Sequence, residues 1–393
     1  MQGRKTFKIG IVAGEVSGDL LAAGLIRALK LYPYTFEFTG IAGPNMQQQS
    51  CKSLFPMNKL TLMGLDGLFG RLAEILQIRR SLLHYFVADP PDLFIGIDAP
   101  DFNLGLEKKL RKAGTPVLHY VSPTVWAWRK YRLRSMRYSI DRILVLFPFE
   151  LDFYRQHQLN VKLVGHPMVR DIDSDPDIKS LKKRFGISLQ KKVIALLPGS
   201  RRGEIQRMAG DFLLAAARLS KKYPNLQFVT AMPDTALMDV FEEEVQKADT
   251  KDIDLVRVHG HSRDVMACAD ILMLASGTAA LEAAIVGRPV VVAYKVSWLT
   301  KTMVQLLASV KYFSMPNNLV GYRLVPELMQ DDCTPENLER EVSVYLNNEA
   351  EVTRVISAFK KIRQSLDLDS DRLAAETVLD MLGLKNKIEP EYY

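Results

Sequence analysis

Two aspartates in the stretch FIGIDAPDF, Asp98 and Asp101, have a residue type and a position that suit acid–base chemistry. They follow an apolar run that is typical of a buried strand, and ligands of α/β proteins bind at the carboxyl ends of such strands. A general base needs an acceptor oxygen within hydrogen-bond reach of the hydroxyl that it deprotonates. We expect Asp98 to be the better candidate for this base, and Asp101 to cap the helix that follows.

The stretch VAGEVSGD, residues 12–19, joins an apolar run to a helical pattern, as the phosphate-binding turns of nucleotide-binding folds do. It differs from those turns because it carries two carboxylates, Glu15 and Asp19. Two negative charges would repel a diphosphate, so this turn is expected to bind a different group.

A turn in the second half of the chain has the opposite charge. In LLPGSRRGE, an apolar run leads into Gly199 and Ser200, and Arg201 and Arg202 precede a helical pattern. A helix N-terminus offers unpaired N–H groups and a positive dipole end to an anion, and arginine adds a fork that matches phosphate oxygens. The turn predicts a phosphate site, with a solvated arginine pair as the alternative.

A second turn suited to anions lies in LASGTAALE. Its small residues allow the backbone to approach a diphosphate closely. Glu282, about one helical turn later, could accept hydrogen bonds from both ribose hydroxyls. The alternative is an ordinary strand-to-helix junction with a surface glutamate, but two such turns in one half of the chain favour a nucleotide. The small residues are Ser276, Gly277, Thr278 and Ala279.

The segment 60–86 carries an apolar stripe, and its glycine-broken front half is apolar where a loop is ordinarily polar. This part of the chain either packs on a sheet or contacts lipid. The residues predicted to contact lipid are Met63, Leu65, Leu68, Phe69 and Leu72.

The segment HYVSPTVWAWRKYR combines two tryptophans with arginine and lysine. It is compatible with a nucleic-acid surface, with an aromatic wall beside an anionic membrane, and with a solvated basic helix. The segment alone does not choose among them.

The elements that must position these turns alternate between short apolar strands and helical patterns. The alternation predicts the α/β class, with two doubly wound, Rossmann-like domains that face a cleft. We expect an N-terminal domain over 1–168, a linker over 169–190, a C-terminal domain over 191–365, and a C-terminal helix and tail over 366–393. The expected strands are FKIGIVAG, DLFIGIDA, PVLHYVS and RILVLFP, followed by KKVIALLPGS, NLQFVTAM, IDLVRVHG, ADILMLASG and PVVVAYK.

The composition of the 393 residues is globular, with 48% hydrophobic and 25% charged residues. A net charge of +7 suits anionic small molecules, nucleic acid or lipid without choosing among them. Three dispersed cysteines argue against a disulfide framework, and no residue cluster predicts a metal site. No apolar run has the length that a bilayer crossing needs, and the first residues lack the apolar core of a signal peptide, so membrane contact is expected to be peripheral.

Six segments together resemble the signature segments of the lipid-A-disaccharide synthase family, in that family's order and over nearly the whole chain. They are VAGEVSGD, GIDAPDFN, HYVSPTVWAWR, LLPGSRRGE, LASGTAALE and SMPNNLVG. The resemblance implies the GT-B fold and an inverting, metal-independent glycosyltransferase without a cofactor. It implies UDP-2,3-diacylglucosamine as donor and 2,3-diacylglucosamine 1-phosphate (lipid X) as acceptor. The implied products are the β-1′,6-linked disaccharide 1-phosphate and UDP.

On this resemblance, Asp98 takes the proton of the acceptor's 6-hydroxyl, and Glu15, Ser17 and Asp19 lie on the acceptor side. The resemblance also implies peripheral binding at the cytoplasmic face of the inner membrane of a Gram-negative bacterium. A homodimer is a family-level expectation, and a nucleic-acid partner is not expected. The residues expected to bind the UDP of the donor are Gly199, Ser200, Arg201, Arg202, Ser276, Gly277, Thr278, Ala279, Glu282 and Asn317.

Two other functions fit parts of the sequence. Another UDP-sugar enzyme of the same fold, such as a UDP-N-acetylglucosamine 2-epimerase, would keep the donor turns but would not need the apolar segment 60–86. A non-catalytic protein that binds RNA or a lipid surface would tolerate Asp98→Asn, and its affinity would fall steeply with salt.

Overall fold

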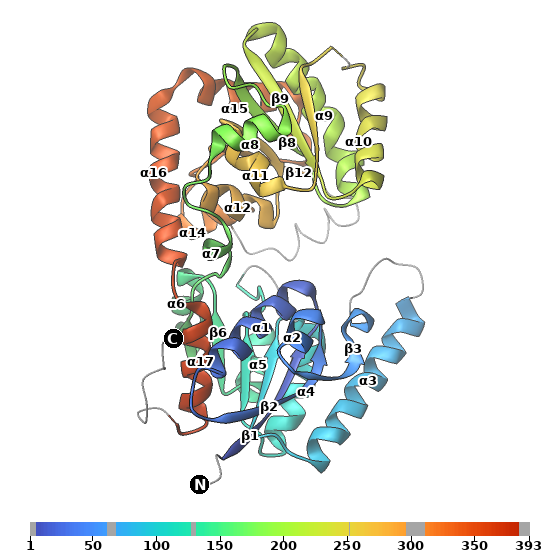
Figure 1. Cartoon of the computed structure of the whole chain (residues 1–393), viewed down its shortest axis with the longest axis vertical. Helices are drawn as coiled ribbons and strands as arrows, with labels where there is room; N and C mark the ends of the chain where they lie inside the picture. The colour runs from blue at the N-terminus through green and yellow to red at the C-terminus, as the bar shows by residue number, and fades with distance from the viewer. Residues whose placement is uncertain (1–4, 61–67, 127–130, 251, 296–310, 385–393) are drawn as a thin grey trace. The chain divides into compact units, whose positions relative to one another are not determined.

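The computed structural model describes residues 5–60, 68–126, 131–250, 252–295 and 311–384. The chain divides into two compact units, each built on a parallel sheet with helices (Figure 1). Unit 1 comprises Met1–Pro167 and Leu366–Tyr393, and unit 2 comprises Met168–Ser365. The predicted α/β class with two doubly wound domains is confirmed.

In the described part of unit 1, seven parallel strands form a sheet in the order β3-β2-β1-β4-β5-β6-β7. The strand order reverses between β1 and β4, so the turns that follow these two strands are neighbours at the switch point, where open α/β sheets bind ligands. The strands are β1 (Thr6–Ala13), β2 (Thr35–Ala42), β3 (Lys52–Pro56), β4 (Leu93–Ile97), β5 (Val117–Tyr120), β6 (Arg142–Val145) and β7 (Val161–Leu163). The helices are α1 (Val16–Leu29), α2 (Pro44–Gln48), η1 (Met57–Lys59), α3 (Leu68–Ala88), α4 (Pro100–Lys112), α5 (Arg132–Ser139), α6 (Pro148–Gln156) and α17 (Ser370–Met381).

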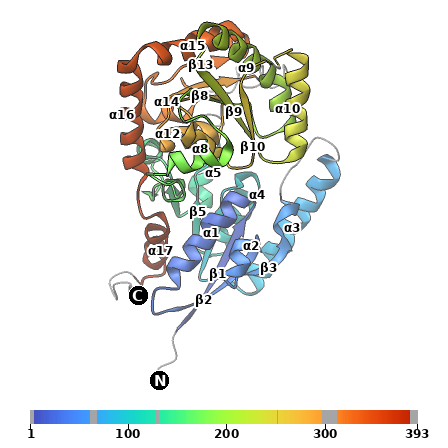
Figure 2. The same cartoon turned by 45° about the horizontal axis from the view of Figure 1, so that its top comes forward.

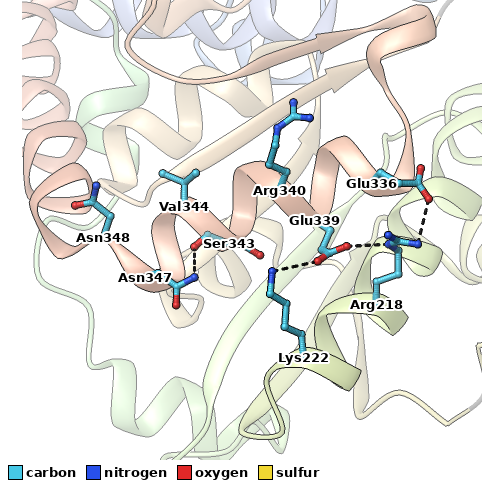
Figure 3. A pocket seen from close by; sticks show the side chains of 9 residues that line it. All are labelled: Arg218, Lys222, Glu336, Glu339, Arg340, Ser343, Val344, Asn347 and Asn348. Carbon is cyan, nitrogen blue, oxygen red and sulfur yellow. Dashed lines mark hydrogen bonds and ion pairs between the residues drawn. The ribbon is translucent and has the colours of Figure 1, made fainter.

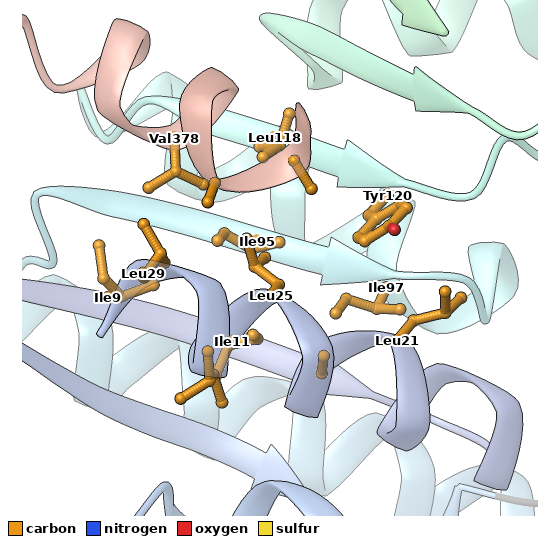
Figure 4. Close-up of a cluster of buried hydrophobic side chains, with 14 of the residues drawn as sticks. Ile9, Ile11, Leu21, Leu25, Leu29, Ile95, Ile97, Leu118, Tyr120 and Val378 are labelled. Carbon is orange, nitrogen blue, oxygen red and sulfur yellow. The ribbon is translucent and has the colours of Figure 1, made fainter. Parts of the chain in front are cut away.

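One face of this sheet is covered by α1 and α17, which lie side by side (Figure 1). Leu21, Leu25 and Leu29 recur at helical spacing on α1 and are buried against the strands. Ile95 of β4 and Val378 of α17 belong to the same cluster (Figure 4). Because helices cover both faces of the sheet, its central strands are almost continuously apolar, which is why their sequences could be recognised.

The opposite face is covered by α3 and α4. Ile78, Leu82 and Phe86 of α3 are buried in one cluster with Leu106 and Leu110 of α4. The C-terminal part of the apolar stripe in segment 60–86 therefore packs on the sheet, which was one of the two alternatives that the sequence left open.

In the described part of unit 2, six parallel strands follow the order β10-β9-β8-β11-β12-β13, with the switch point between β8 and β11. On the outside, α9 and α10 lie side by side (Figure 2). The strands are β8 (Lys192–Leu197), β9 (Leu226–Met232), β10 (Leu255–His259), β11 (Ile271–Ala275), β12 (Val290–Tyr294) and β13 (Glu327–Met329). The helices are α7 (Met168–Asp171), α8 (Ile178–Phe185), α9 (Arg202–Lys222), α10 (Thr235–Lys247), α11 (Ser262–Cys268), α12 (Thr278–Val286), α14 (Met315–Val320), η2 (Gln330–Asp332), α15 (Pro335–Asn347) and α16 (Glu349–Leu366).

The structure differs from the expected organisation in two places. Residues 169–190, expected as a linker, include α7 and α8 and belong to unit 2. Helix α8 carries Ile178, Leu181 and Phe185 at helical spacing, a signal that the sequence analysis missed in a polar, proline-containing stretch, and none of the three is fully buried. Strands β2, β3, β7 and β13 were not predicted; β3 and β7 are short and incompletely buried, which removes the apolar signal at the sheet edges.

Candidate functional site

The turn that follows β4 carries Asp98 in an unusual backbone conformation. Asp98 and Ala99 both lie in the left-handed region, with φ of 49° and 42°. Residues other than glycine rarely adopt it, and each costs roughly 1–3 kcal/mol, so such turns persist where neighbours fix them, often at functional sites. The Asp98 N–H donates to the Tyr120 carbonyl at 2.9 Å, and Asn103 Nδ2 donates to the Asp98 carbonyl at 2.8 Å. The partly buried Asp98 side chain thus sits on a constrained turn at the switch point.

The turn after β1 packs directly on this turn. A Cβ added at Gly14 would lie 2.6 Å from Ala99 Cβ, which only glycine avoids. Glu15 and Ser17 are exposed at the start of α1, and the Glu15 carboxylate makes no capping bond to the helix. The structure therefore brings Glu15 and Ser17 next to the turn of Asp98, with their polar groups accessible.

Asp19 was expected on the acceptor side with Glu15 and Ser17, but unlike them it is not exposed. Its side chain is fully buried. Its oxygens accept from the Asn45 and Met46 N–H groups at 2.9 and 3.0 Å and from Asn45 Nδ2 at 2.9 Å. Because the carboxylate satisfies the N-terminus of α2, it stabilises the fold and is not available to a sugar hydroxyl.

Asp101 was expected to cap the helix that follows β4. Ala99 occupies the N-cap position of α4 without a side-chain hydrogen bond. Asp101 lies in the first turn of α4, where its charge favours the helix dipole, and its exposed carboxylate pairs with Arg132. Asp101 is thus a solvated helix residue, and Asp98 is the carboxylate of this stretch that the turn constrains.

The segment that follows β5 is anchored by a buried glutamate. Val121 has φ of 73°, which is rare for a β-branched residue and places a second strained turn beside that of Asp98. Glu150 of α6 accepts from Ser122 Oγ at 2.5 Å, from Trp126 Nε1 at 3.2 Å and from the Phe147 N–H at 3.1 Å. Burial raises the pKa of the Glu150 carboxyl to about 7, although these hydrogen bonds act in the opposite direction.

This raised pKa predicts a pH-dependent stability that depends on Glu150. An unfolded glutamate releases its proton near 4.5, whereas the folded one holds it to about 7. The free energy of unfolding therefore falls as the pH rises from about 4.5 to 7, by up to roughly 3 kcal/mol from this group. Denaturant unfolding of Glu150→Gln and of the parent protein between pH 5 and 8 tests this. The difference in stability should shift in favour of the variant as the pH rises, and parallel profiles would contradict the prediction.

Loops at the carboxyl edge of the second sheet converge on a cavity of about 600 Å³ in unit 2. They follow β8, β9, β10 and β11, and Tyr294 at the end of β12 completes the wall. The volume suits a nucleotide-sized ligand. Of the residues predicted to bind the donor, Gly199, Ser200, Arg201, Ser276, Gly277, Thr278, Ala279 and Glu282 line this cavity.

The loop after β8 is shaped by Glu204, which the sequence reasoning missed. Glu204 Oε2 accepts from the Ser200 N–H at 3.0 Å. Gly199 has φ of 137°, and a Cβ at this position would lie only 2.5 Å from Glu204 Cβ, so the Glu204 side chain fits only beside a glycine. The Arg201 side chain is 84% exposed and lies 3.7 Å from Glu204 in an ion pair of the kind that is easily broken. Arg202, the first residue of α9, is not among the described residues that line the cavity. The loop therefore favours Arg201 as the anion ligand.

The loop after β11 leads into α12, whose first N–H groups face no capping side chain. Glu282, one turn later on the same helix, is mostly buried and accepts from Arg263 Nε at 2.9 Å. Arg263 of α11 thereby holds the carboxylate at the cavity wall. A helix N-terminus combined with a fixed carboxylate suits a nucleoside diphosphate, with the phosphates at the N–H groups and the ribose at Glu282.

The loop after β10 contributes His261, which the sequence analysis did not assign. His261 lines the cavity in the left-handed conformation, with φ of 55°, and its Nδ1 lies 3.1 Å from the Asp264 carboxylate. The sequence could have indicated a role for His261 only by its position, because its loop follows a predicted strand, as the two recognised loops do. Among the described residues, no cluster of three or more histidine, cysteine, aspartate or glutamate side chains is arranged to hold a metal ion.

Asn317 was expected to line the donor side, and it is not among the described residues that line the cavity. It is fully buried, and its Oδ1 accepts from the Leu324 and Val325 N–H groups at 2.8 and 2.9 Å. Its Nδ2 donates to the Val325 carbonyl and to Glu327 Oε1. Both ends of the amide are therefore occupied. Asn317 supports the segment whose Phe313 carbonyl accepts from Ser276 Oγ at 3.4 Å, so its effect on the cavity is indirect.

The residues predicted to contact lipid are only partly described. Met63 and Leu65 lie outside the described residues, and Leu68 and Phe69 begin α3 with side chains that are also outside the description. Leu72 and Leu76, one turn apart on α3, are 49% and 37% exposed. No helix in the described ranges combines the length and apolar character required to cross a membrane.

A second hollow on unit 2, about 530 Å³, lies between α9 and α15 (Figure 3). Its charged groups neutralise one another: Arg218 contacts Glu336 and Glu339 at 3.1 and 2.8 Å, and Lys222 contacts Glu339 at 3.4 Å. These ion pairs give the hollow no evident preference for an anion, so we assign no ligand to it.

Two doubly wound parallel sheets, with a nucleotide-sized cavity at the switch point of the second, define the GT-B class. Solved structures agree at the level of the fold. A UDP-GlcNAc 2-epimerase from Neisseria meningitidis bound to UDP-GlcNAc has a TM-score of 0.62 at 14% identity, covering 96% of this chain and 100% of that one. CalG4, the calicheamicin glycosyltransferase, has a TM-score of 0.57 at 12% identity, covering 98% and 100%.

Sequence comparison is more specific. The family model described as lipid-A-disaccharide synthetase matches residues 9–380. The lipid-A-disaccharide synthase of Aeromonas hydrophila is 44% identical over 376 residues, covering 96% of this chain and 98% of its own. That of Pseudomonas aeruginosa is 41% identical over 375 residues, covering 95% and 98%. The chain belongs to the lipid-A-disaccharide synthase family, a family of glycosyltransferases.

The comparisons do not favour the alternative functions. The similarity to epimerases is limited to the fold, at 14% identity for the Neisseria enzyme, whereas the synthases share about 40% of their residues over nearly their full length. A non-catalytic RNA- or lipid-binding protein also finds no support in a family of enzymes.

Proposed function

We propose that this chain transfers the diacylglucosamine of UDP-2,3-diacylglucosamine to the 6-hydroxyl of 2,3-diacylglucosamine 1-phosphate, and releases UDP and the β-1′,6-linked disaccharide 1-phosphate. The observation that carries the proposal is the family match over residues 9–380, which spans both the constrained turn of Asp98 and the residues that line the cavity of unit 2. Unit 1 supplies the base, and unit 2 binds the donor.

The reaction is a single in-line displacement. The Asp98 carboxylate accepts the proton of the acceptor hydroxyl while the oxygen attacks the anomeric carbon of the donor. The bond between that carbon and the UDP oxygen breaks, and the electron pair leaves with UDP. Attack from the face opposite UDP inverts the anomeric configuration, which accounts for a β-linked product.

Unit 2 stabilises the leaving diphosphate. The N–H groups at the start of α12 and the Arg201 guanidinium supply hydrogen-bond donors and positive charge where the negative charge of UDP develops. We assign the ribose hydroxyls to the Glu282 carboxylate, which Arg263 holds in place. The small residues 276–279 let the backbone approach the phosphates.

On unit 1, Glu15 and Ser17 are proposed to bind acceptor hydroxyls. Both are exposed beside the turn of Asp98, and the Glu15 carboxylate makes no capping bond to α1. Their position at the switch point is where an α/β sheet offers a sugar site.

The acyl chains of both substrates require an apolar surface, because each methylene group removed from water contributes about 0.8 kcal/mol. We propose that the front of α3, with Leu72 and Leu76, contacts the cytoplasmic face of the inner membrane as a peripheral surface. These two side chains are exposed although the rear of α3 is in the core. The net charge of +7 favours an anionic lipid surface.

The double variant Leu72→Ser/Leu76→Ser is expected to reduce binding to anionic phospholipid vesicles about tenfold, because less apolar area enters the lipid. Vesicle co-sedimentation measures this. Leu214→Ser, which removes a similarly exposed leucine from α9 of unit 2, is the matched control and should bind as the parent protein does. Equal loss in both variants would contradict a specific role for α3.

The proposed reaction is tested with purified protein, UDP-2,3-diacylglucosamine and lipid X, in the presence of EDTA. Disaccharide 1-phosphate and UDP should form in equal amounts, with the β configuration at the new bond. Absence of product with both substrates in mixed micelles would refute the proposal. Interconversion of UDP-N-acetylglucosamine without transfer would instead support the epimerase alternative.

A further inference from the structure

A column of buried polar side chains lies beneath the turn of Asp98, and the reaction described above does not use it. Asn103 and Glu107 are four residues apart on one face of α4, and His119 lies on β5. All three are fully buried. His119 Nδ1 and Glu107 Oε1 are 2.6 Å apart.

The strand between them is adapted to this column. Gly96 of β4 pairs in register with His119 of β5. A Cβ at Gly96 would collide with Glu107 Oε1 and would lie 3.2 Å from Asn103 Cβ. A glycine in the middle of a buried strand weakens the strand, so its presence is explained by the two polar side chains that cross over it.

Asn103 is the member of the column that contacts the strained turn of Asp98. Asn103 Nδ2 donates to the carbonyl of Asp98 at 2.8 Å and to that of Ile97 at 3.3 Å. These bonds, together with the bond from the Asp98 N–H to the Tyr120 carbonyl, constrain the turn that contains the two left-handed residues Asp98 and Ala99. The orientation of the Asp98 carboxylate therefore depends on the position of the Asn103 side chain.

The lower end fixes α4 to the sheet. Burial lowers the pKa of His119. The negative charges of Glu107 and Asp98 and the hydrogen bond to Glu107 raise it by a larger amount, so the net shift of the pKa is upward. A histidine–carboxylate hydrogen bond is strong and directional where water is excluded. Within the described residues, Asn103 Oδ1 and Glu107 Oε2 have no hydrogen-bond partner among the protein atoms. Three polar side chains that are costly to bury together are not explained by stability alone.

We propose that Asn103, Glu107 and His119 are positioning residues for the reaction. The Glu107–His119 pair fixes the position of α4 relative to β5. Asn103, on the same helix, fixes the turn through its hydrogen bonds to the carbonyls of Ile97 and Asp98. This turn then orients the Asp98 carboxylate toward the acceptor hydroxyl. None of the three contacts substrate. The proposal rests on the assignment of Asp98 as the base, and small misplacements of a catalytic group lower the rate strongly.

The test uses the full chain and measures kcat, the KM for the donor, UDP affinity and thermal unfolding. Asn103→Ala is expected to lower kcat 10- to 100-fold, and the isosteric Glu107→Gln about tenfold, with donor KM and UDP affinity unchanged. Thr377→Ala removes another buried side-chain hydrogen bond of unit 1 and serves as the control for lost stability. It should retain kcat at temperatures where it is folded.

Two further variants separate positioning from a general structural effect. In the double variant Glu107→Gln/His119→Gln, an uncharged amide pair can restore the contact, so kcat should recover relative to Glu107→Gln alone. In the Asp98→Asn background, Asn103→Ala should lower kcat no further, because the group that it positions is absent. Folded Glu107→Gln and Asn103→Ala proteins with the parent kcat would overturn the proposal. If Asp98→Asn itself retained turnover, the base assignment would fail instead, which distinguishes the two outcomes.

Discussion

Asp98→Asn is expected to lower the kcat of disaccharide formation by about 10²- to 10⁴-fold while UDP affinity stays unchanged. This is the range by which a positioned general base accelerates proton transfer. The UDP site lies in unit 2, in the loops after β8 to β11, and none of these contains Asp98. Removal of the base should therefore affect the chemical step and not donor binding.

Asparagine is the informative substitution because of the backbone at this position. Asp98 has φ of 49°, and asparagine tolerates the left-handed region about as well as aspartate does. The N–H and carbonyl of residue 98 can keep their bonds to Tyr120 and Asn103. An alanine would combine loss of the carboxylate with added strain, so its effect could not be assigned to chemistry.

Asp101→Asn is the matched control. It removes the other carboxylate of the same stretch, which is exposed and paired with Arg132, and it should change kcat by less than about threefold. Initial rates under saturating substrates and calorimetric titration with UDP measure both quantities. Turnover that survives in Asp98→Asn, or is lost equally in Asp101→Asn, would mean that the base lies elsewhere.

Arg201→Ala is expected to weaken UDP binding and to raise the donor KM by about 10- to 100-fold. A hydrogen bond to a charged group contributes roughly 1.5–3 kcal/mol, and the arginine fork faces the cavity at an N-terminal helix end. The exposed ion pair with Glu204, 3.7 Å long, is inexpensive to break, so Arg201 is free to exchange this partner for phosphate.

Arg202→Ala provides a control that differs by one position. Arg202 carries the same charge at the same helix N-terminus, but it is not among the described residues that line the cavity. Its removal should change UDP affinity by no more than about twofold, through long-range charge alone. Similar losses in the two variants would indicate that the turn attracts UDP by its total charge, and that both arginines share the role.

Two features explain how much of the fold was evident in the sequence. Strands such as FKIGIVAG and ADILMLASG are buried on both faces, so they are continuous apolar runs bounded by turn residues. The helices between them bury one face and show it at helical spacing, as Leu21, Leu25 and Leu29 do. Short edge strands that bury little, such as β3 and β7, leave no such pattern and were missed.

The two sites were predictable to different degrees. Glycine, small residues and arginine at a strand-to-helix turn have local physical causes, so the turns at 199–201 and 276–279 could be recognised without knowledge of the fold. The burial of Asp19 and Asn317 could not be predicted, because their partners Asn45 and Glu327 lie far along the chain or on another element. A carboxylate that is free to bind a ligand and one that holds a loop have the same sequence signature.

The sequence by itself thus determined the α/β class, the alternation of strands and helices, and the turns with the composition to bind anions or sugars, because these depend on periodicity and on local backbone chemistry. Only the tertiary structure decided that α17 returns to unit 1 and that Glu15 is exposed while Asp19 is buried. It also decided that His119 meets Glu107 under the turn of Asp98. The reason is physical: whether a polar group is satisfied or free depends on neighbours that the fold, and not the local sequence, brings within hydrogen-bond distance.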